Sequence, residues 1–325
     1  MNKKKKMFEK KTDILRLFFP TIVLLIECGI YYLVPNAYPV GYEPEVWPQF
    51  LLVAAAFFAV LSLIGLIARP LRTRLVKYCF VIAAFCILMG IYDLLTLKSG
   101  ILQPPMWYCG DKIVIYFMKH WTTLLTETGV SLGLLGRGLI MGVLAGAFCG
   151  TLSGISKVSN YWIAPLLRII GPIPPLVMMP ITFAMFPKGN AAATVLIMWA
   201  MWFPLTLKLT AAIRNLPPDV LECARVLGAS KLHVVIHVII PLVLPAVFQG
   251  LFMGLSSSFG TMGAVEALGS PGGIIYDLNV NSDLCRYYGV YAIFPILVAC
   301  FSIIVRILFW IRDYCLRWQK GYKRG

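Results

Sequence analysis

Residues 48–68 read PQFLLVAAAFFAVLSLIGLIA, a run that contains no charged side chain. About 20 apolar residues in a helix cross the ~30 Å hydrocarbon core of a bilayer. A helix satisfies its backbone hydrogen bonds internally, whereas an open sheet in lipid cannot. The alternating pattern of a membrane β-strand is also missing from this run. The stretch therefore predicts a membrane-spanning helix.

Further stretches of the same kind recur along the chain. Hydrophobic residues make up 59% of the sequence and charged residues 13%, against the ~25% that is usual for soluble domains. The first stretch follows Lys3–Lys6 but is long enough to span and has no small-residue cleavage site, which favours a retained helix over a signal peptide. We predict an all-α polytopic membrane protein with about eight spans: 14–34, 48–68, 76–97, 131–151, 163–186, 191–211, 238–261 and 289–311.

The net charge of +15 is distributed unevenly about these spans. If the chain crosses the membrane at each of them, 21 of the 29 basic residues fall on the side that holds both termini. Membrane proteins keep such an excess of Lys and Arg in the cytoplasm. The pattern predicts cytoplasmic termini and gives little support to nucleic-acid binding.

The chain divides near residue 128. Residues 1–128 are expected to form a membrane extension, with three spans that are apolar nearly all round and should pack at the periphery, next to lipid. The aromatic-rich segment 98–128 should lie along the outer surface, because Trp and Tyr favour the interface. Residues 129–325 should form a second domain. Its first span carries a glycine at every fourth position, namely Gly138, Gly142, Gly146, Gly150 and Gly154.

Three features of this second domain have alternative interpretations. Glycines at four-residue spacing let another helix approach closely, either inside one subunit or at a pore or partner subunit. The span 163–186 carries Pro172, Pro174, Pro175 and Pro180, so it must kink or break. Such breaks line substrate pathways or serve packing. Glu266 is either a pathway or gate residue, or an interfacial and solvated carboxylate.

The segment between two later spans carries the most information. Residues 216–231 read LPPDVLECARVLGASK. Pro217, Pro218 and Asp219 start a helix, and Gly228 is placed to stop it in the left-handed conformation. Ser230 is a good N-cap for a second helix that continues into the next span. The sequence therefore predicts a helix–turn–helix finger at residues 216–236 (the finger), although an ordinary interfacial loop is the simpler alternative.

The finger resembles the EAA loop of ABC importer permeases. Glu222-Cys223-Ala224, Gly228, Val238, Ile240 and Pro241 follow the spacing of that motif, with conservative departures at positions 223, 238 and 240. The resemblance covers about residues 121–320 and is greatest for the nitrate/sulfonate/taurine/bicarbonate branch, which includes the aliphatic sulfonate permease. The branch's Trp-Phe-Gly stretch is replaced here by residues 186–190, and the first three spans are additional to its five-helix core.

This resemblance implies a permease subunit of the bacterial cell membrane rather than an enzyme. It would form the pathway for a small organic or inorganic anion, such as a sulfonate or nitrate, or for a vitamin precursor. Its partners would be a cytoplasmic ATPase dimer, which binds ATP and Mg²⁺, an external substrate-binding protein and a second permease copy. The expected coupling residues are Asp219, Glu222, Cys223, Ala224, Arg225, Gly228, Ala229, Ser230 and Pro241, with Ala224 and Gly228 permitting close approach of the ATPase.

Other functions receive less support from the residues. The chain has no G-x-x-x-x-G-K-[ST] sequence to cradle ATP phosphates, so we expect no cofactor in it. His233 and His237 lie one helical turn apart, but two ligands do not make a zinc site. A secondary carrier would be expected to show inverted repeats and ionisable residues near the midplane, and neither is evident. Cys109 and Cys285 are expected as two separate thiols or, alternatively, as a disulfide.

Overall fold

The computed structural model describes residues 16–37, 46–186, 188–268 and 272–318. These residues are helical or lie in short connections, and no strand occurs among them, which confirms the all-α fold. The chain divides into two compact units. Unit 1 comprises residues 1–121 and 281–292, and unit 2 comprises residues 122–280 and 293–325. The sequence places its division at residue 128 and does not anticipate that 281–292 pack with the amino-terminal part.

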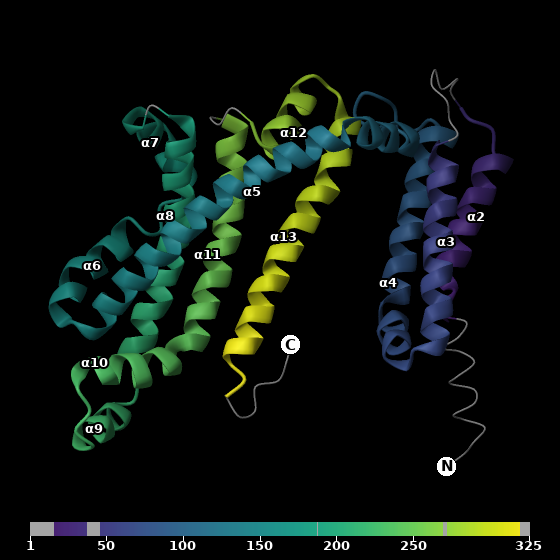
Figure 1. Ribbon diagram of the computed structural model, residues 1–325. Helices are drawn as coiled ribbons and strands as arrows, with labels where there is room; N and C mark the ends of the chain where they lie inside the picture. The colour runs from purple at the N-terminus through teal and green to yellow at the C-terminus, as the bar shows by residue number, and fades with distance from the viewer. Residues whose placement is uncertain (1–15, 38–45, 187, 269–271, 319–325) are drawn as a thin grey trace, which may run out of the picture. The chain divides into compact units, whose positions relative to one another are not determined.

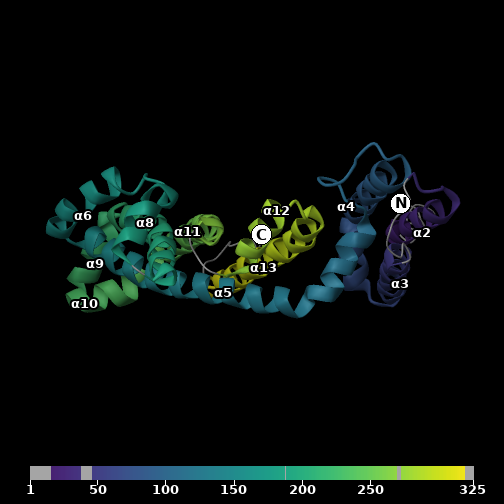
Figure 2. The same cartoon turned by 90° about the horizontal axis from the view of Figure 1, so that it is seen from above.

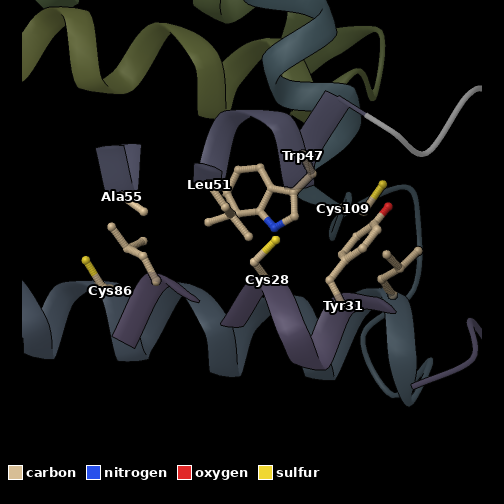
Figure 3. Close-up of a cluster of buried hydrophobic side chains, with 9 residues drawn as sticks. Cys28, Tyr31, Trp47, Leu51, Ala55, Cys86 and Cys109 are labelled. Atoms are coloured by element: carbon tan, nitrogen blue, oxygen red, sulfur yellow. The ribbon is translucent and has the colours of Figure 1, made fainter. Parts of the chain in front are cut away.

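Unit 1 is built on a bundle of three helices, α2 (Phe19–Leu33), α3 (Val46–Ile67) and α4 (Arg69–Asp93) (Figure 1). A short π-helix, η1 (Leu94–Lys98), extends α4. Buried apolar side chains from these helices meet in one cluster, which includes Leu24, Cys28, Trp47, Leu51 and Cys86 (Figure 3). Cys109 joins this cluster, Cys285 is exposed, and both are thiols.

The helices of the bundle are not apolar all round, contrary to the sequence-based expectation. Glu27, Asp93 and Lys98 are buried within it, so ionisable groups do lie inside predicted spans. Hydropathy averaged over a span hides a single carboxyl group, because some 20 apolar neighbours dominate the mean. The structure therefore corrects the expectation that the first three spans are apolar nearly all round, because α2 and α4 each carry a buried carboxyl group.

Unit 2 holds most of α5 (Gly110–Ile155), followed by α6 (Lys157–Ile169), the 3₁₀ turn η2 (Pro175–Met178), α7 (Met179–Met185) and α8 (Gly189–Arg214). The finger contains α9 (Pro218–Val226), α10 (Lys231–Val234) and the π-helix η3 (Val235–Ile239). The chain ends with α11 (Ile240–Leu268), α12 (Ile274–Asp283) and α13 (Tyr287–Cys315). Helices α8 and α11 lie side by side in both views (Figures 1 and 2).

Six of the described helices are long and apolar enough to cross a membrane, where the sequence predicts about eight. They are Val46–Ile67, Leu75–Lys98, Gly110–Ile155, Gly189–Arg214, Leu232–Leu268 and Tyr287–Cys315. The predicted span 14–34 appears as the 15-residue helix α2, and residues before 16 lie outside the described part. The predicted span 163–186 is broken, as its prolines indicate, into the end of α6, η2 and α7.

Helix α5 also differs from expectation. It has 46 residues and extends about 69 Å at ~1.5 Å per residue, more than twice the hydrocarbon thickness. Residues 110–128, expected in a separate surface segment, form the first part of this continuous helix. No proline interrupts the chain from Gly110 to Ile155, so nothing in the sequence stops the helix.

Candidate functional site

Local sequence signals shape the first half of the finger. Helix α9 begins at Pro218, carries Asp219 in its first turn and ends at Val226. Gly228 then has φ +77°, the left-handed conformation expected there. The N–H of Ala229 donates to the carbonyl of Ala224 at 3.1 Å, which is the long hydrogen bond of a Schellman motif. This hydrogen bond supplies a donor for a carbonyl at the end of α9.

Ser230 begins the second half of the finger. Its hydroxyl accepts a hydrogen bond from the N–H of His233 at 3.3 Å, as an N-cap does. Helix α10 then passes through η3 into α11 without a break. Pro241 cannot donate to the carbonyl of His237, which lies in η3, and this missing bond accounts for an irregular turn at that point. Figure 1 shows α9 and α10 at one end of α8 and α11, with α7 at the other end of α8.

One face of the finger packs against its own chain. Ala224 and Ala229 contact a buried cluster at the base of α8 and α11, made of Leu209, Ile213, Val234, Ile239 and Val243. Ala224 is therefore only partly accessible, and its small side chain serves the fit of α9 against α8 and α11. The close approach of an ATPase at Ala224 stays a prediction.

The opposite face of the finger is open. Glu222 and Cys223 are exposed, together with Val226 and Leu227, whose side chains are 87% and 85% exposed, and Leu232. Val226, Leu227 and Leu232 are not among the predicted coupling residues, although apolar residues inside a charged loop were a signal for them. Arg225 lies in α9, but its side chain is outside the described part of the structure.

The glycine-stepped face of α5 is filled by α8. A Cβ added to Gly142 would lie 2.6 Å from Cβ of Met201, and one added to Gly154 would lie 2.6 Å from Cβ of Ile213. Ile197, Leu205 and Leu209 stand in the same relation to Gly138, Gly146 and Gly150. The hydroxyl of Thr210 donates to the carbonyl of Gly150 at 3.3 Å. These contacts favour packing inside the chain over a pore-lining role.

Helix α11 also approaches α8 closely through glycine residues. A Cβ on Gly250 would lie 3.1 Å from the backbone of Leu205, and Gly254 faces Met201. Ser258 donates to the carbonyl of Ile197 at 3.2 Å. Helix α8 thus packs closely against two glycine-bearing helices, α5 and α11.

The proline-rich segment forms the break between α6 and α7. Pro172 and Pro174 lie in the irregular turn, Pro175 begins η2, and Pro180 occupies the first turn of α7. Pro172, Pro174 and Pro180 are exposed. Gly171, just before them, has no room for a side chain because it lies against Phe203 of α8. The segment therefore turns in contact with α8.

Glu266 is fully buried, so the solvated alternative is wrong. Its Oε2 accepts a hydrogen bond from the N–H of Ile275 at 3.0 Å, in the first turn of α12. Glu127 and Ser131 of α5 accept hydrogen bonds from the two preceding N–H groups, those of Gly273 and Ile274, at 2.7 and 2.8 Å respectively. A helix amino terminus favours carboxylates and supplies unpaired donors. Glu266 thus joins α11 to α12, while α5 holds the same turn.

The two histidines of the finger lie against each other. The rings of His233 and His237 stack at a centroid distance of 4.2 Å. Among the described residues, no group of three or more His, Cys, Asp or Glu side chains is placed to hold a metal ion.

Residues 138–317 match the family of binding-protein-dependent transport system inner membrane components, and the chain belongs to this family. The match covers more than half of the chain and includes α6 to α13 with the finger. The chain is therefore a multi-pass membrane protein of a transport family, which is not an enzyme class.

Individual relatives agree with the family. The chain is 28% identical over 158 residues to the nitrate import permease protein NrtB of Leptolyngbya laminosa, covering 46% of this chain and 56% of the relative. It is 29% identical over 108 residues to the bicarbonate transport system permease protein CmpB of Synechococcus elongatus, covering 33% and 39%. The chain thus spans about half the length of the curated relatives it matches. A structure of the MetNI methionine ABC transporter aligns with 60% of this chain and 95% of its own, at 21% identity and a TM-score of 0.49.

Proposed function

We propose that the chain is the membrane permease subunit of an ATP-driven ABC importer. Its substrate would be a small organic or inorganic anion, such as a sulfonate or nitrate, or a vitamin precursor. The observation that carries this proposal is the finger itself, in a chain of this transport family. Its short helix ends at Val226, just before the left-handed Gly228, and Val226 and Leu227 are presented to the outside. The relatives named for nitrate and bicarbonate support the choice of an anion.

Energy would enter through contact with other subunits. The partners are a cytoplasmic ATPase dimer that binds ATP and Mg²⁺, an extracytoplasmic substrate-binding protein, and a second copy of this permease. Closure of the ATPase dimer moves the finger, and the finger displaces α8 and α11, to whose base it is packed. ATP shifts the population of transport states only because the ATPase binds them with different affinity.

The pathway would run beside the broken segment between α6 and α7 rather than along the glycine stripe. The stripe is covered by α8, whereas Pro172, Pro174 and Pro180 are exposed. Pro175 and Pro180 fix the turn that leads back into the membrane domain. Glu266 contributes by holding the connection between α11 and α12, which would keep this end of α11 fixed as the finger end moves.

A replacement on the finger tests the coupling. Leu227→Asp should weaken binding of the ATPase dimer by about tenfold or more, because burying a leucine side chain is worth ~1.5–3 kcal/mol. Affinity is measured with purified permease in nanodiscs and the ATPase encoded with it. The control is Leu268→Asp, since Leu268 is also exposed, at 71%, but lies at the opposite end of α11.

The outcome distinguishes the main function from its alternative. Unchanged ATPase binding by the Leu227→Asp variant would remove the finger from the interface. Substrate uptake that continues without any ATPase, driven by an ion gradient, would indicate a secondary carrier instead.

The proposed membrane is the bacterial inner (plasma) membrane, with both termini in the cytoplasm. This topology rests on the excess of basic residues on that side. Cysteine replacement at Ser230, which is exposed at the start of α10, should be labelled by a membrane-impermeant maleimide only after the cells are opened. Labelling of intact spheroplasts at this position would contradict the topology.

A further inference from the structure

Unit 1 contains a group of buried ionisable side chains that the family match at residues 138–317 does not include. Helix α2 contributes Glu27, α4 contributes Asp93, η1 contributes Lys98, and the first turn of α5 contributes Asp111. Glu27 is 7% exposed and Asp93 4% exposed, and the other two are also buried. This part of the described chain therefore buries three carboxyl groups and one ammonium group.

The ammonium group of Lys98 is fully used by neutral acceptors. Its Nζ donates to the carbonyls of Tyr31 and Val34 at 2.6 and 2.7 Å and to Oδ1 of Asn36 at 2.7 Å. An ammonium group has three N–H donors, so none remains for a carboxylate. Lys98 ties η1 to the end of α2, and its charge reaches the carboxylates only through space.

Asp111 is also satisfied. Its Oδ1 accepts a hydrogen bond from the N–H of Trp47 at 2.8 Å, and its Oδ2 accepts one from the hydroxyl of Tyr31 at 3.3 Å. These donors stabilise an ionised carboxylate. The charge of Lys98 acts on both Asp93 and Asp111, and one ammonium group cannot neutralise three carboxylates. Glu27 has no cationic side chain beside it among the described residues.

Glu27 lies in an apolar position with both oxygens buried and without a hydrogen-bonding partner among the described residues. Its Cδ is 3.2 Å from the point that a Cβ on Gly90 would occupy, so the glycine makes room for the carboxyl group. Asp93 follows Gly90 by three residues and shares that face of α4. Its Oδ1 is likewise buried without a partner.

Among the described residues, no cationic side chain lies beside Glu27. The titratable groups around Glu27 are Asp93 and the thiols of Cys28 and Cys86. Those around Asp93, besides Glu27, are Lys98, Asp111 and the phenols of Tyr31 and Tyr92. A metal ion such as Ca²⁺ takes six to eight oxygen ligands, which two carboxyl groups cannot supply. An isolated charge in an apolar interior is costly enough that the group neutralises instead. A proton is the ligand that meets this need.

We propose that Glu27 and Asp93 form a proton-binding site in the membrane part of unit 1. Glu27 holds a proton at neutral pH, and Asp93 is the second group of the pair. The site is independent of the finger and of the proposed ATPase coupling. It gives the amino-terminal helices a chemical property of their own, the uptake of at least one proton when the chain folds in the membrane.

Infrared difference spectroscopy on the full chain in lipid nanodiscs tests the proposal directly. The wild type should show the carbonyl stretch of a protonated carboxylic acid at pH 7, shifted by ¹³C-glutamate labelling. Glu27→Gln should remove this band. The control is Asp283→Asn, since Asp283 is exposed, and it should leave the band unchanged. Absence of a glutamic-acid band in the labelled wild type overturns the proposal and requires no variant to fold.

Stability against pH gives a second readout. There is a pH range in which the carboxyl group is ionised in the unfolded chain but protonated in the folded chain. Within this range the folding equilibrium constant falls tenfold for each unit by which the pH rises. The wild-type melting temperature should therefore fall as pH rises over this range, and the Glu27→Gln profile should be flatter. In Asp93→Asn the band should still be present at acidic pH. As the pH is raised, it should disappear at a lower pH than in the wild type, because a like charge no longer opposes ionisation of Glu27.

The same profile separates a proton from a metal cation. Replacing choline chloride by sodium chloride at equal ionic strength should leave the wild-type curve unchanged. Recovery of the high-pH stability by Na⁺ alone would assign the site to that ion and overturn the proposal. Identical pH profiles for the wild type and Glu27→Gln would also overturn the proposal.

Discussion

Gly228→Val should uncouple ATP hydrolysis from transport while the permease remains inserted in the membrane. Gly228 has φ +77°, and a β-branched residue held there costs about 1–3 kcal/mol. A Cβ at this position meets nothing within 4 Å, so the cost is purely conformational. A loss of one to two kcal/mol shifts an equilibrium by about 5–30-fold. We therefore expect uptake in proteoliposomes to fall by about tenfold at an ATPase activity close to that of the wild type.

The matched control is Gly228→Asn. Asparagine enters the left-handed region at low cost because its side chain can hydrogen-bond locally. It also adds a polar side chain into the same open space, so only the backbone preference distinguishes the two variants. Uptake by Gly228→Asn should remain within about twofold of the wild type. Full uptake by the valine variant would show that the left-handed turn is not needed for coupling.

The finger could be predicted because its signals are local. Pro218, Asp219, Gly228 and Ser230 each act on their own turn of backbone, and the structure has the helix start, the left-handed turn and the cap where the sequence placed them. The two faces of α9 could not be assigned in this way. Ala224 turns inward and Leu227 outward because of the cluster at Ile213 and Val243, which only tertiary packing brings together.

Long-range features of the membrane part were harder to predict from the sequence. A hydropathy window finds the apolar stretch of α5 but not the 20 or so more polar residues that continue the same helix from Gly110. The break within residues 163–186 could be predicted from its prolines, but hydropathy does not show where the separate helices begin and end. The carboxyl group of Glu27 passed unnoticed for the related reason that the surrounding residues dominate the average.

The glycine stripe of α5 should be the most sensitive part of unit 2 to small changes. In Gly142→Ala the new Cβ would lie 2.6 Å from Cβ of Met201 and 2.7 Å from the carbonyl oxygen of Met198. Neither atom is the end of a flexible side chain, so α5 and α8 must move apart. Overpacking of this kind costs about 1–3 kcal/mol. The melting temperature of the purified permease should fall by several degrees.

Gly133→Ala on the same helix provides the control. A Cβ at Gly133 meets nothing within 4 Å, and replacing a helical glycine by alanine is favourable by roughly 0.5–1 kcal/mol. Its melting temperature should be equal to or higher than that of the wild type. The comparison also decides between the two roles of the stripe. If the stripe faced a pore or a partner subunit rather than α8, Gly142→Ala would leave the melting temperature of the isolated chain unchanged and alter only transport or assembly.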